Sequence, residues 1–257
     1  AAFSVLAGAG WGAVTLVNHK LAVGGGALEA ANVQAPALAE VTGGPGSLIP
    51  WEQQSRESSR WLSEVLRAEQ ISSVMGEPAE QPIRVYASLE SARSEQARAD
   101  LLLAEIDRTG ALDRSVFALF SPTGSGYVNY VACETLEYLT RGDCASACVQ
   151  YSVLPSALSL SRVHMGTRQT HMVVNGIVER LLSRPLEKRP KFVLFGESLG
   201  SQVSQEMFRG QGITGPAGIG LDAAVWIGTP NATVWRDELW GTRPVSQVPA
   251  VGPGAAF

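Results

Sequence analysis

Short apolar runs alternate with segments of helical periodicity in this 257-residue chain. The apolar runs cover residues 83–87, 116–120, 147–151, 192–195 and 223–227. The segments between them, which can each place apolar side chains on one face, cover residues 92–109, 131–140, 163–184 and 201–209. This alternation is typical of an α/β fold, in which helices cover both faces of a mostly parallel sheet.

Glycines indicate where the predicted helices end or are interrupted. Gly110 directly follows the segment 92–109 and suits a C-terminal helix cap. Gly166 and Gly176 weaken the prediction of one continuous helix over residues 163–184, because glycine lowers helix stability. Residues 51–75 show an amphipathic pattern, which predicts one or two surface helices packed against the α/β domain.

The first 50 residues differ from the rest of the chain. Residues 1–18 carry no charge, and the chain does not start with methionine. We interpret this stretch as the end of a transmembrane segment, with a signal peptide or a buried core helix as the alternatives. Residues 22–50 are rich in glycine and turn-forming residues, which predicts a connector. The expected division is therefore 1–42, membrane segment and connector, and 43–257, the α/β domain.

Bulk composition narrows the possible partners. Hydrophobic residues make up 45% of the chain and charged residues 17%, and the net charge is −4, so we expect no nucleic-acid partner. Cys133, Cys144 and Cys148 form no Cys-x-x-Cys pair and have no neighbouring histidine, which favours buried free thiols over a zinc site. A disulfide between Cys144 and Cys148 is the less favoured alternative. We expect no metal and no cofactor.

The fourth apolar run leads directly into Gly-Glu-Ser-Leu-Gly at residues 196–200. A helix-compatible segment follows, so the pattern has the strand and the helix that a Gly-x-Ser-x-Gly nucleophile elbow requires. In such a turn a strained backbone exposes the serine hydroxyl above the sheet, and the glycines let strand and helix approach closely. We predict that Ser198 is a nucleophile. The alternative is an ordinary strand-to-helix turn with a solvated serine.

A second loop, Ser-Pro-Thr-Gly-Ser-Gly at residues 121–126, follows the second apolar run. Because the carboxyl ends of parallel strands meet at one edge of the sheet, we expect this loop near Ser198. An oxyanion hole takes one amide from the residue after the nucleophile and another from an earlier loop. We therefore assign Leu199 and Thr123 as the two donors, with Gly124 as the next choice. The alternative is a structural turn with no catalytic role. Nucleotide binding is not favoured, because the spacing does not match a nucleotide-binding loop.

A serine nucleophile needs a base and an orienting acid. The histidines, His19, His164 and His171, all precede Ser198, whereas an elbow serine is usually followed by its acid and histidine. Either the chain is cut before its final strands, or an unusual base acts, with His164 as the first candidate and His171 as the second. Only one apolar run follows the elbow, which favours the cut. The acids that we interpret as surface, capping or filler positions are Asp222, Asp237 and Glu197.

Several further motifs, taken together with the elbow, indicate a protein family. They include Gly-Gly-Pro-Gly-Ser-Leu-Ile-Pro-Trp at 43–51, Pro-Ile-Arg-Val-Tyr at 82–86, Pro-Thr-Gly-Ser-Gly-Tyr at 122–127 and Trp-Ile-Gly-Thr-Pro-Asn at 226–231. On these motifs the chain resembles the actinobacterial membrane-linked α/β-hydrolase family. The resemblance implies an incomplete α/β-hydrolase domain over 43–257, with Ser198 as its nucleophile. It also implies that residues 1–18 end the last membrane helix and that a C-terminal continuation carries the acid and the histidine.

Together these features predict a membrane-associated serine hydrolase that cleaves an ester through an acyl-enzyme on Ser198. The expected substrate is a small-molecule or lipid-like ester. The lipid-like part rests on the predicted membrane segment and on the apolar residues 153–155 near the site. The alternatives are an acyltransferase that uses the same nucleophile and a non-catalytic hydrolase-fold membrane module.

Overall fold

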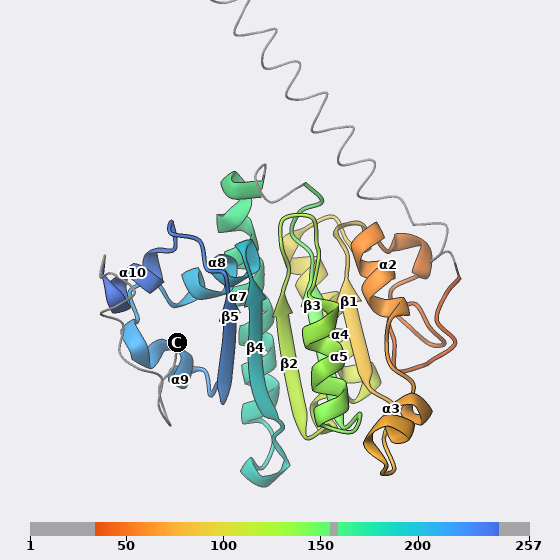
Figure 1. Ribbon diagram of the computed structural model, residues 1–257. Helices are drawn as coiled ribbons and strands as arrows, with labels where there is room; N and C mark the ends of the chain where they lie inside the picture. The colour runs from red at the N-terminus through yellow and green to blue at the C-terminus, as the bar shows by residue number, and fades with distance from the viewer. Residues whose placement is uncertain (1–33, 155–158, 242–257) are drawn as a thin grey trace, which may run out of the picture.

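The computed structural model describes residues 34–154 and 159–241, and in this part of the chain five strands form one parallel sheet (Figure 1). The strands are β1 (Ile83–Ala87), β2 (Val116–Ser121), β3 (Cys144–Val149), β4 (Lys191–Glu197) and β5 (Ala223–Ile227). They lie in the order β1-β3-β2-β4-β5, and each neighbouring pair is parallel. The predicted α/β fold is confirmed.

The third strand begins earlier than its hydrophobic pattern indicates. The apolar run predicts a strand at 147–151, but β3 covers Cys144–Val149. Cys144, Ala145 and Ser146 are completely buried, and all three pair with β2. Their small side chains give almost no hydrophobic signal, although small residues fit well in a strand that helices cover on both faces.

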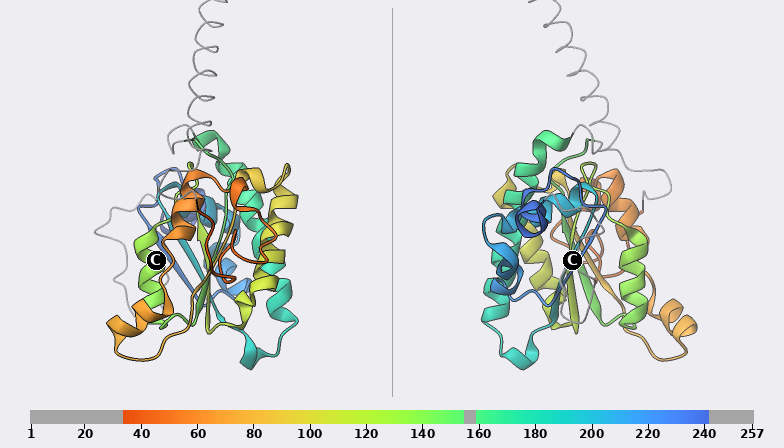
Figure 2. Two further views of the ribbon diagram at one scale, coloured as in Figure 1. Left: turned by 90° about the vertical axis from the view of Figure 1, so that its right-hand side faces the viewer. Right: turned by 60° about the vertical axis from the view of Figure 1, so that its left-hand side comes forward.

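Helices cover both faces of the sheet, as Figure 2 shows. α4 (Glu95–Thr109) and α7 (Val163–Leu182) lie on one face, and α2 (Arg56–Ser63) and α5 (Tyr130–Leu139) lie on the other. α8 packs beside α7. The bounds of the remaining helices are Ala68–Met75 for α3, Leu199–Gln205 for α8, Gly215–Gly218 for α9 and Val234–Trp240 for α10.

The glycines at the helices have different roles. Gly110 ends α4 in the left-handed conformation, with φ of 66°, as predicted for a helix cap. α7 is continuous in spite of its two glycines. A β-carbon at Gly166 would lie 3.0 Å from the Tyr151 ring, and one at Gly176 would overlap the Leu103 side chain of α4. These glycines therefore allow close packing of α7 and do not break it.

The described part of the predicted connector packs against the domain. Val41 is completely buried and forms a parallel bridge with Arg84 of β1. The buried carboxylate of Glu105 on α4 accepts hydrogen bonds from the Leu48 amide at 2.6 Å and from the Thr42 hydroxyl at 3.1 Å. Turn-rich composition does not reveal these contacts, because Thr42 and Leu48 lie 63 and 57 residues away from Glu105 in the sequence.

Residues 51–75 contain the helices α2 and α3, in agreement with the amphipathic pattern. Trp61, Leu62 and Val65 are buried against the α5 face of the sheet. Within the described ranges, no helix has the length and apolar character needed to cross a membrane. The predicted transmembrane segment at residues 1–18 lies outside those ranges.

Candidate active site

The nucleophile elbow is formed by a strand, a sharp turn and a helix. β4 ends at Glu197 and α8 begins at Leu199, and Ser198 between them has φ of 51° and ψ of −121°. A residue with a β-carbon rarely adopts such angles, and this kind of backbone strain is concentrated at functional sites. Ser198 is exposed. The strand–turn–helix context predicted from the sequence is confirmed.

Backbone hydrogen bonds hold the strained turn on both sides. The Ser198 amide donates to the Ile227 carbonyl at the end of β5, at 2.8 Å. The Ser198 carbonyl accepts from the Ser201 amide at 3.0 Å and from the Ser201 hydroxyl at 2.6 Å. The sheet therefore fixes the entry to the turn and the helix fixes its exit, and both sets of bonds use backbone atoms of Ser198.

The two elbow glycines leave no room for a β-carbon. At Gly196 it would lie 2.7 Å from Ser201 Cα, and at Gly200 it would overlap the carbonyl oxygen of Ser121 at the end of β2. The close approach of strand and helix that the motif predicts is present. Because Ser121 pairs with Gly196, the loop that follows β2 begins beside the elbow.

This loop, residues 122–127, folds into a tight turn. The Gly126 amide donates to the Thr123 carbonyl at 3.0 Å, and the Thr123 amide donates to the Tyr127 carbonyl at 2.9 Å. The second bond counts against Thr123 as the second oxyanion donor, because its N–H already has an acceptor. The C=O and N–H of a planar trans peptide point in opposite directions. Since the Thr123 carbonyl points into the turn, the Gly124 amide points out of it and is the better placed donor.

Leu199 fits the position of the first donor. It is the first residue of α8, so its amide has no acceptor within the helix. Its side chain is 2% exposed and packs into the protein, while its backbone forms the exit of the turn. The positive end of the helix dipole lies at the same point, which favours a developing negative charge there. The role of Leu199 as a donor stays a prediction.

Glu197 has a partner that motif reasoning missed. Its Oε2 accepts a hydrogen bond from Asn129 Nδ2 at 2.9 Å, so Glu197 is more than a filler position. Asn129 in turn caps α5, because its Oδ1 accepts from the Ala132 amide at 2.9 Å. Burial raises the pKa of the nearby Tyr127, and the Glu197 carboxylate raises it further. These contacts connect the elbow to the start of α5 across 68 residues of sequence.

The loop after β3 supports the 122–127 loop from one side. Val153 and Leu154 are 8% and 2% exposed, so the described part of the apolar stretch 153–155 faces the interior. A β-carbon at Gly124 would overlap the Ser159 side chain and lie 2.9 Å from the Leu154 carbonyl oxygen. Pro155 lies outside the described residues. Val153 and Leu154 therefore act in packing and offer little apolar surface to a substrate.

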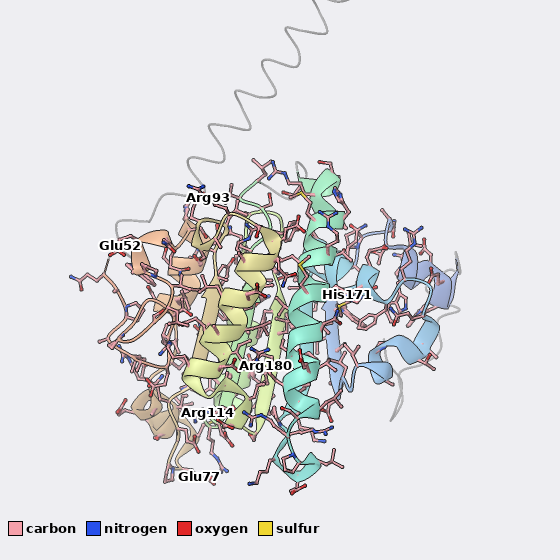
Figure 3. All side chains as sticks on the ribbon, turned by 180° about the vertical axis from the view of Figure 1, so that it is seen from behind. Glu52, Glu77, Arg93, Arg114, His171 and Arg180 are labelled. Carbon is pink, nitrogen blue, oxygen red and sulfur yellow. The ribbon has the colours of Figure 1, made fainter. Side chains whose placement is uncertain are left out.

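The candidate bases His164 and His171 both lie on α7 and are exposed. Figure 3 shows His171 partway along the helix. His164 lines an open pocket of 410 Å³ together with Gln202 and Glu206. Within the described ranges, the hydrogen bonds of Ser198 are made by its backbone and involve neither histidine. His19 lies outside these ranges.

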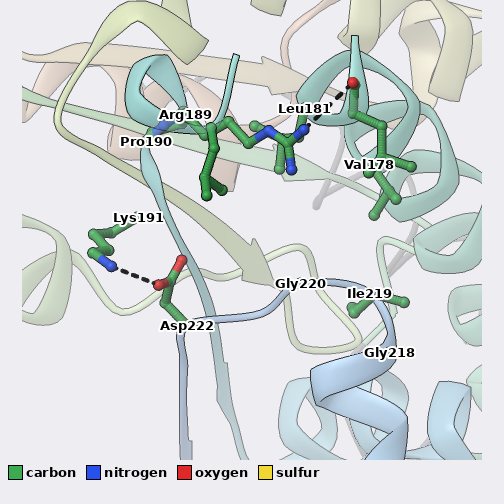
Figure 4. Close-up of a pocket in the computed structure, with 11 residues that line it drawn as sticks. Val178, Leu181, Arg189, Pro190, Lys191, Gly218, Ile219, Gly220 and Asp222 are labelled. Carbon is green, nitrogen blue, oxygen red and sulfur yellow. Dashed lines mark hydrogen bonds and ion pairs between the residues drawn. The ribbon is translucent and has the colours of Figure 1, made fainter. Parts of the chain in front are cut away.

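Asp222 and Asp237, the two acids weighed after the elbow, have the surface or capping roles that were predicted for them. Asp222 precedes β5 at the amino edge of the sheet, where it accepts from the Phe192 amide and pairs with Lys191, both at 2.9 Å. Figure 4 shows this ion pair beside a pocket at the same edge. Asp237 pairs with its neighbour Arg236 at 2.5 Å. Both carboxylates are surface or capping charges.

The three cysteines are buried free thiols, as predicted. Burial raises the pKa of Cys144 to about 12 and also raises the pKa values of Cys133 and Cys148. A thiol that stays protonated at neutral pH is a poor nucleophile and a poor metal ligand. Across residues 34–154 and 159–241, no group of three or more His, Cys, Asp or Glu side chains is placed to hold a metal ion.

Comparison with known proteins agrees with this geometry. The model of the alpha/beta-hydrolase family matches residues 83–255, a range that includes all the strands of the sheet, the elbow and the 122–127 loop. Searches of curated proteins and of solved structures gave no match. The family match covers more than half of the 257 residues. With its parallel sheet and its elbow in place, this chain belongs to the alpha/beta-hydrolase family.

Proposed function

We propose that this protein is a membrane-linked serine hydrolase that cleaves an ester bond through an acyl-enzyme on Ser198. The observation that carries the proposal is the conformation of Ser198, with φ of 51° and ψ of −121° at the end of β4. A solvated serine in an ordinary turn gains nothing from such strain, whereas a nucleophile needs it to stand above the strand ends. Membership of a hydrolase family supports the same chemistry.

The proposed reaction has two steps. Ser198 Oγ attacks the ester carbonyl carbon while its proton passes to a base, and the carbonyl oxygen becomes an oxyanion. The amides of Leu199 and Gly124 donate to that oxyanion, with Thr123 holding the turn that carries Gly124. The alcohol leaves with a proton and the acyl group stays on Oγ. Water then attacks the acyl-enzyme, which releases the acid and restores the Ser198 hydroxyl.

The reaction requires a base. Among the described residues, His164 is the histidine to test first, because it lies in the first turn of α7, which follows the carboxyl end of β3. If His164 is the base, His164→Ala abolishes acylation of Ser198, whereas His171→Ala, the matched control two turns further along α7, leaves it unchanged. If both variants are acylated at the wild-type rate, the base is another residue or belongs to another chain.

Membrane linkage and a lipid-like substrate are the finer parts of the proposal. They are supported by the uncharged residues 1–18 and by the resemblance of the chain to membrane-linked hydrolases. A series of p-nitrophenyl esters of increasing acyl length tests the substrate class. Preference for long acyl chains supports a lipid-like ester. Turnover restricted to short esters contradicts it.

The same assay tests the function itself. Ser198→Ala should abolish turnover, and Ser183→Ala, a matched change at the end of α7, should not alter it. A competing alcohol separates hydrolysis from acyl transfer: an ester product indicates the acyltransferase alternative, in which the alcohol takes the place of water. Wild-type protein that is folded but shows no turnover above the Ser198→Ala level supports the non-catalytic alternative.

A further inference from the structure

Two buried polar side chains hold the 122–127 loop from the interior of the protein. Gln150 Nε2 donates to the Ser125 carbonyl at 3.0 Å, and the Tyr86 hydroxyl donates to the Gly126 carbonyl at 2.7 Å. Gln150 and Tyr86 are both 0% exposed. Gln150 directly follows β3, the neighbour of β2, and Tyr86 lies near the end of β1, on the other side of β3. Neither residue belongs to the elbow motif.

Gln150 connects three separate parts of the carboxyl edge. Its backbone amide donates to the Ala87 carbonyl at the end of β1, at 2.9 Å. Its side-chain Oε1 accepts from the Leu89 amide at 3.1 Å, while its Nε2 donates to Ser125. Both polar atoms of the side chain are therefore used, and the 122–127 loop is tied to β1 and β3. A buried amide with all its partners in place restricts motion strongly, because losing a partner leaves an unsatisfied group.

Gly126 shows how closely the loop rests on this pair. Its φ is 93°, and a β-carbon there would overlap Gln150 Nε2 and lie 2.9 Å from the Tyr86 hydroxyl. The close contact requires glycine for both its conformation and its lack of a side chain. The loop is thus in direct contact with Gln150 and Tyr86.

The contact determines where the loop amides point. The Ser125 carbonyl faces Gln150, so the Gly126 amide of the same planar peptide faces the opposite way, toward the Thr123 carbonyl. That bond directs the Thr123 carbonyl into the turn, and the Gly124 amide therefore points out of it. Because each of these peptides is planar, the position of the Gln150 side chain determines the direction in which the Gly124 amide points.

We infer that Gln150 and Tyr86 are positioning residues that set the direction of the Gly124 amide in the oxyanion hole. The inference rests on the proposed function, in which this amide stabilises the tetrahedral oxyanion. Such donors are effective because they are fixed in place before the reaction. A donor displaced by about 1 Å can cost about 100-fold in rate.

The test compares Gln150→Met with Gln81→Met. Methionine keeps the length of the side chain but removes its hydrogen bonds. Gln81 is the matched control, because its side chain also bridges two backbone groups, the Leu66 carbonyl at 2.8 Å and the Ala68 amide at 3.3 Å, but at the amino edge of the sheet. The readouts are the rate constant for inactivation by a fluorophosphonate and hydrogen exchange of residues 122–127.

We expect Gln150→Met to slow inactivation about 10- to 100-fold and to speed exchange of the loop amides, with neither change in Gln81→Met. Equal inactivation rates in the two variants overturn the inference. If wild-type protein does not react at all, the proposed function fails for this chain, and hydrogen exchange alone tests the inference. Faster exchange of the loop amides in Gln150→Met, but not in Gln81→Met, then supports the positioning role. Unchanged exchange in Gln150→Met overturns it. Should Gln150→Met not fold, Tyr86→Phe, which removes only the hydroxyl, is judged by the same criteria.

Discussion

The elbow and the 122–127 loop lie side by side at one edge of the sheet, but they are held in different ways. Within the elbow, Gly196, Gly200 and Ser201, which allow the turn its shape, lie within three positions of Ser198. The distant partner of the turn is a backbone atom, the Ile227 carbonyl of the neighbouring strand. The loop instead depends on Gln150 and Tyr86, which are 25 and 40 residues away from the carbonyls they hold.

Because of this difference, we expect the elbow and the 122–127 loop to respond differently to substitution. The elbow is a local structure in which backbone atoms are in contact, so a single added carbon has no way to be accommodated. The loop is in contact with the ends of side chains, which move more easily. We therefore expect elbow substitutions to lower the stability of the domain and loop substitutions mainly to lower activity.

The largest loss of stability is expected for Gly200→Ala. Its β-carbon would overlap the Ser121 carbonyl oxygen, a backbone atom of the central sheet, so we expect a loss of about 3 kcal/mol in the free energy of unfolding. Denaturant unfolding measures this quantity. Gly218→Ala in α9 is the matched control, because no atom of the described residues, apart from its own helix and chain neighbours, lies within 4 Å of its β-carbon position. Equal losses in the two variants would contradict the close contact of α8 with β2.

A smaller loss is expected for Gly126→Ala. The φ of 93° costs about 1–2 kcal/mol for a residue with a β-carbon, and the end of the Gln150 side chain can shift only by weakening its hydrogen bonds, without displacement of the sheet backbone. Gly76→Ala is the control, because Gly76 has φ of 72° and, among the residues that the structure describes, only its chain neighbours come within 4 Å of its β-carbon position. Unfolding measurements should give a slightly larger loss for Gly126→Ala than for Gly76→Ala, and only Gly126→Ala should slow the reaction with a fluorophosphonate. A similar decrease in rate for both would show that the loop has no special role.

The smallest effect is expected for the contact between Glu197 at the end of β4 and Asn129 at the start of α5. A double-mutant cycle with alanine at each position should give a coupling energy of about 1 kcal/mol, because one part-buried hydrogen bond to a carboxylate is lost. The surface pair of Arg60 on α2 and Glu64 directly after it provides the comparison, with an expected coupling of about 0.3–0.5 kcal/mol. If the coupling between Glu197 and Asn129 is no larger than that of this surface pair, their hydrogen bond does not stabilise the connection between the elbow and α5.

The same contrast explains how much could be predicted from the sequence. Each strand of the described sheet was located by its apolar run, and only β3 was displaced, because Cys144, Ala145 and Ser146 are small. The elbow was recognised because its requirements lie within five consecutive residues and the strand and helix beside them. Local patterns therefore predicted the fold class and the conformation of Ser198.

Long-range contacts could not be predicted in this way. Thr123 was the first choice as second donor, but the direction of its amide depends on its bond to the Tyr127 carbonyl, which a sequence pattern does not show. The partner of Glu197 and the roles of Gln150 and Tyr86 depend on contacts across 25 to 68 residues. A single sequence carries no signal for such pairs, because a buried glutamine at a strand end has many possible partners.

The central claim, that the strained serine at the end of β4 is a nucleophile, is tested most directly by fluorophosphonate labelling and mass spectrometry. Trypsin releases residues 192–209 as one peptide that also contains Ser201 and Ser204, so fragment ions must assign the modified residue. The account predicts a phosphonyl group on Ser198, lost in Ser198→Ala and retained in Ser183→Ala. A folded wild-type chain that takes up no label, or that takes it up at a different serine, would contradict the claim.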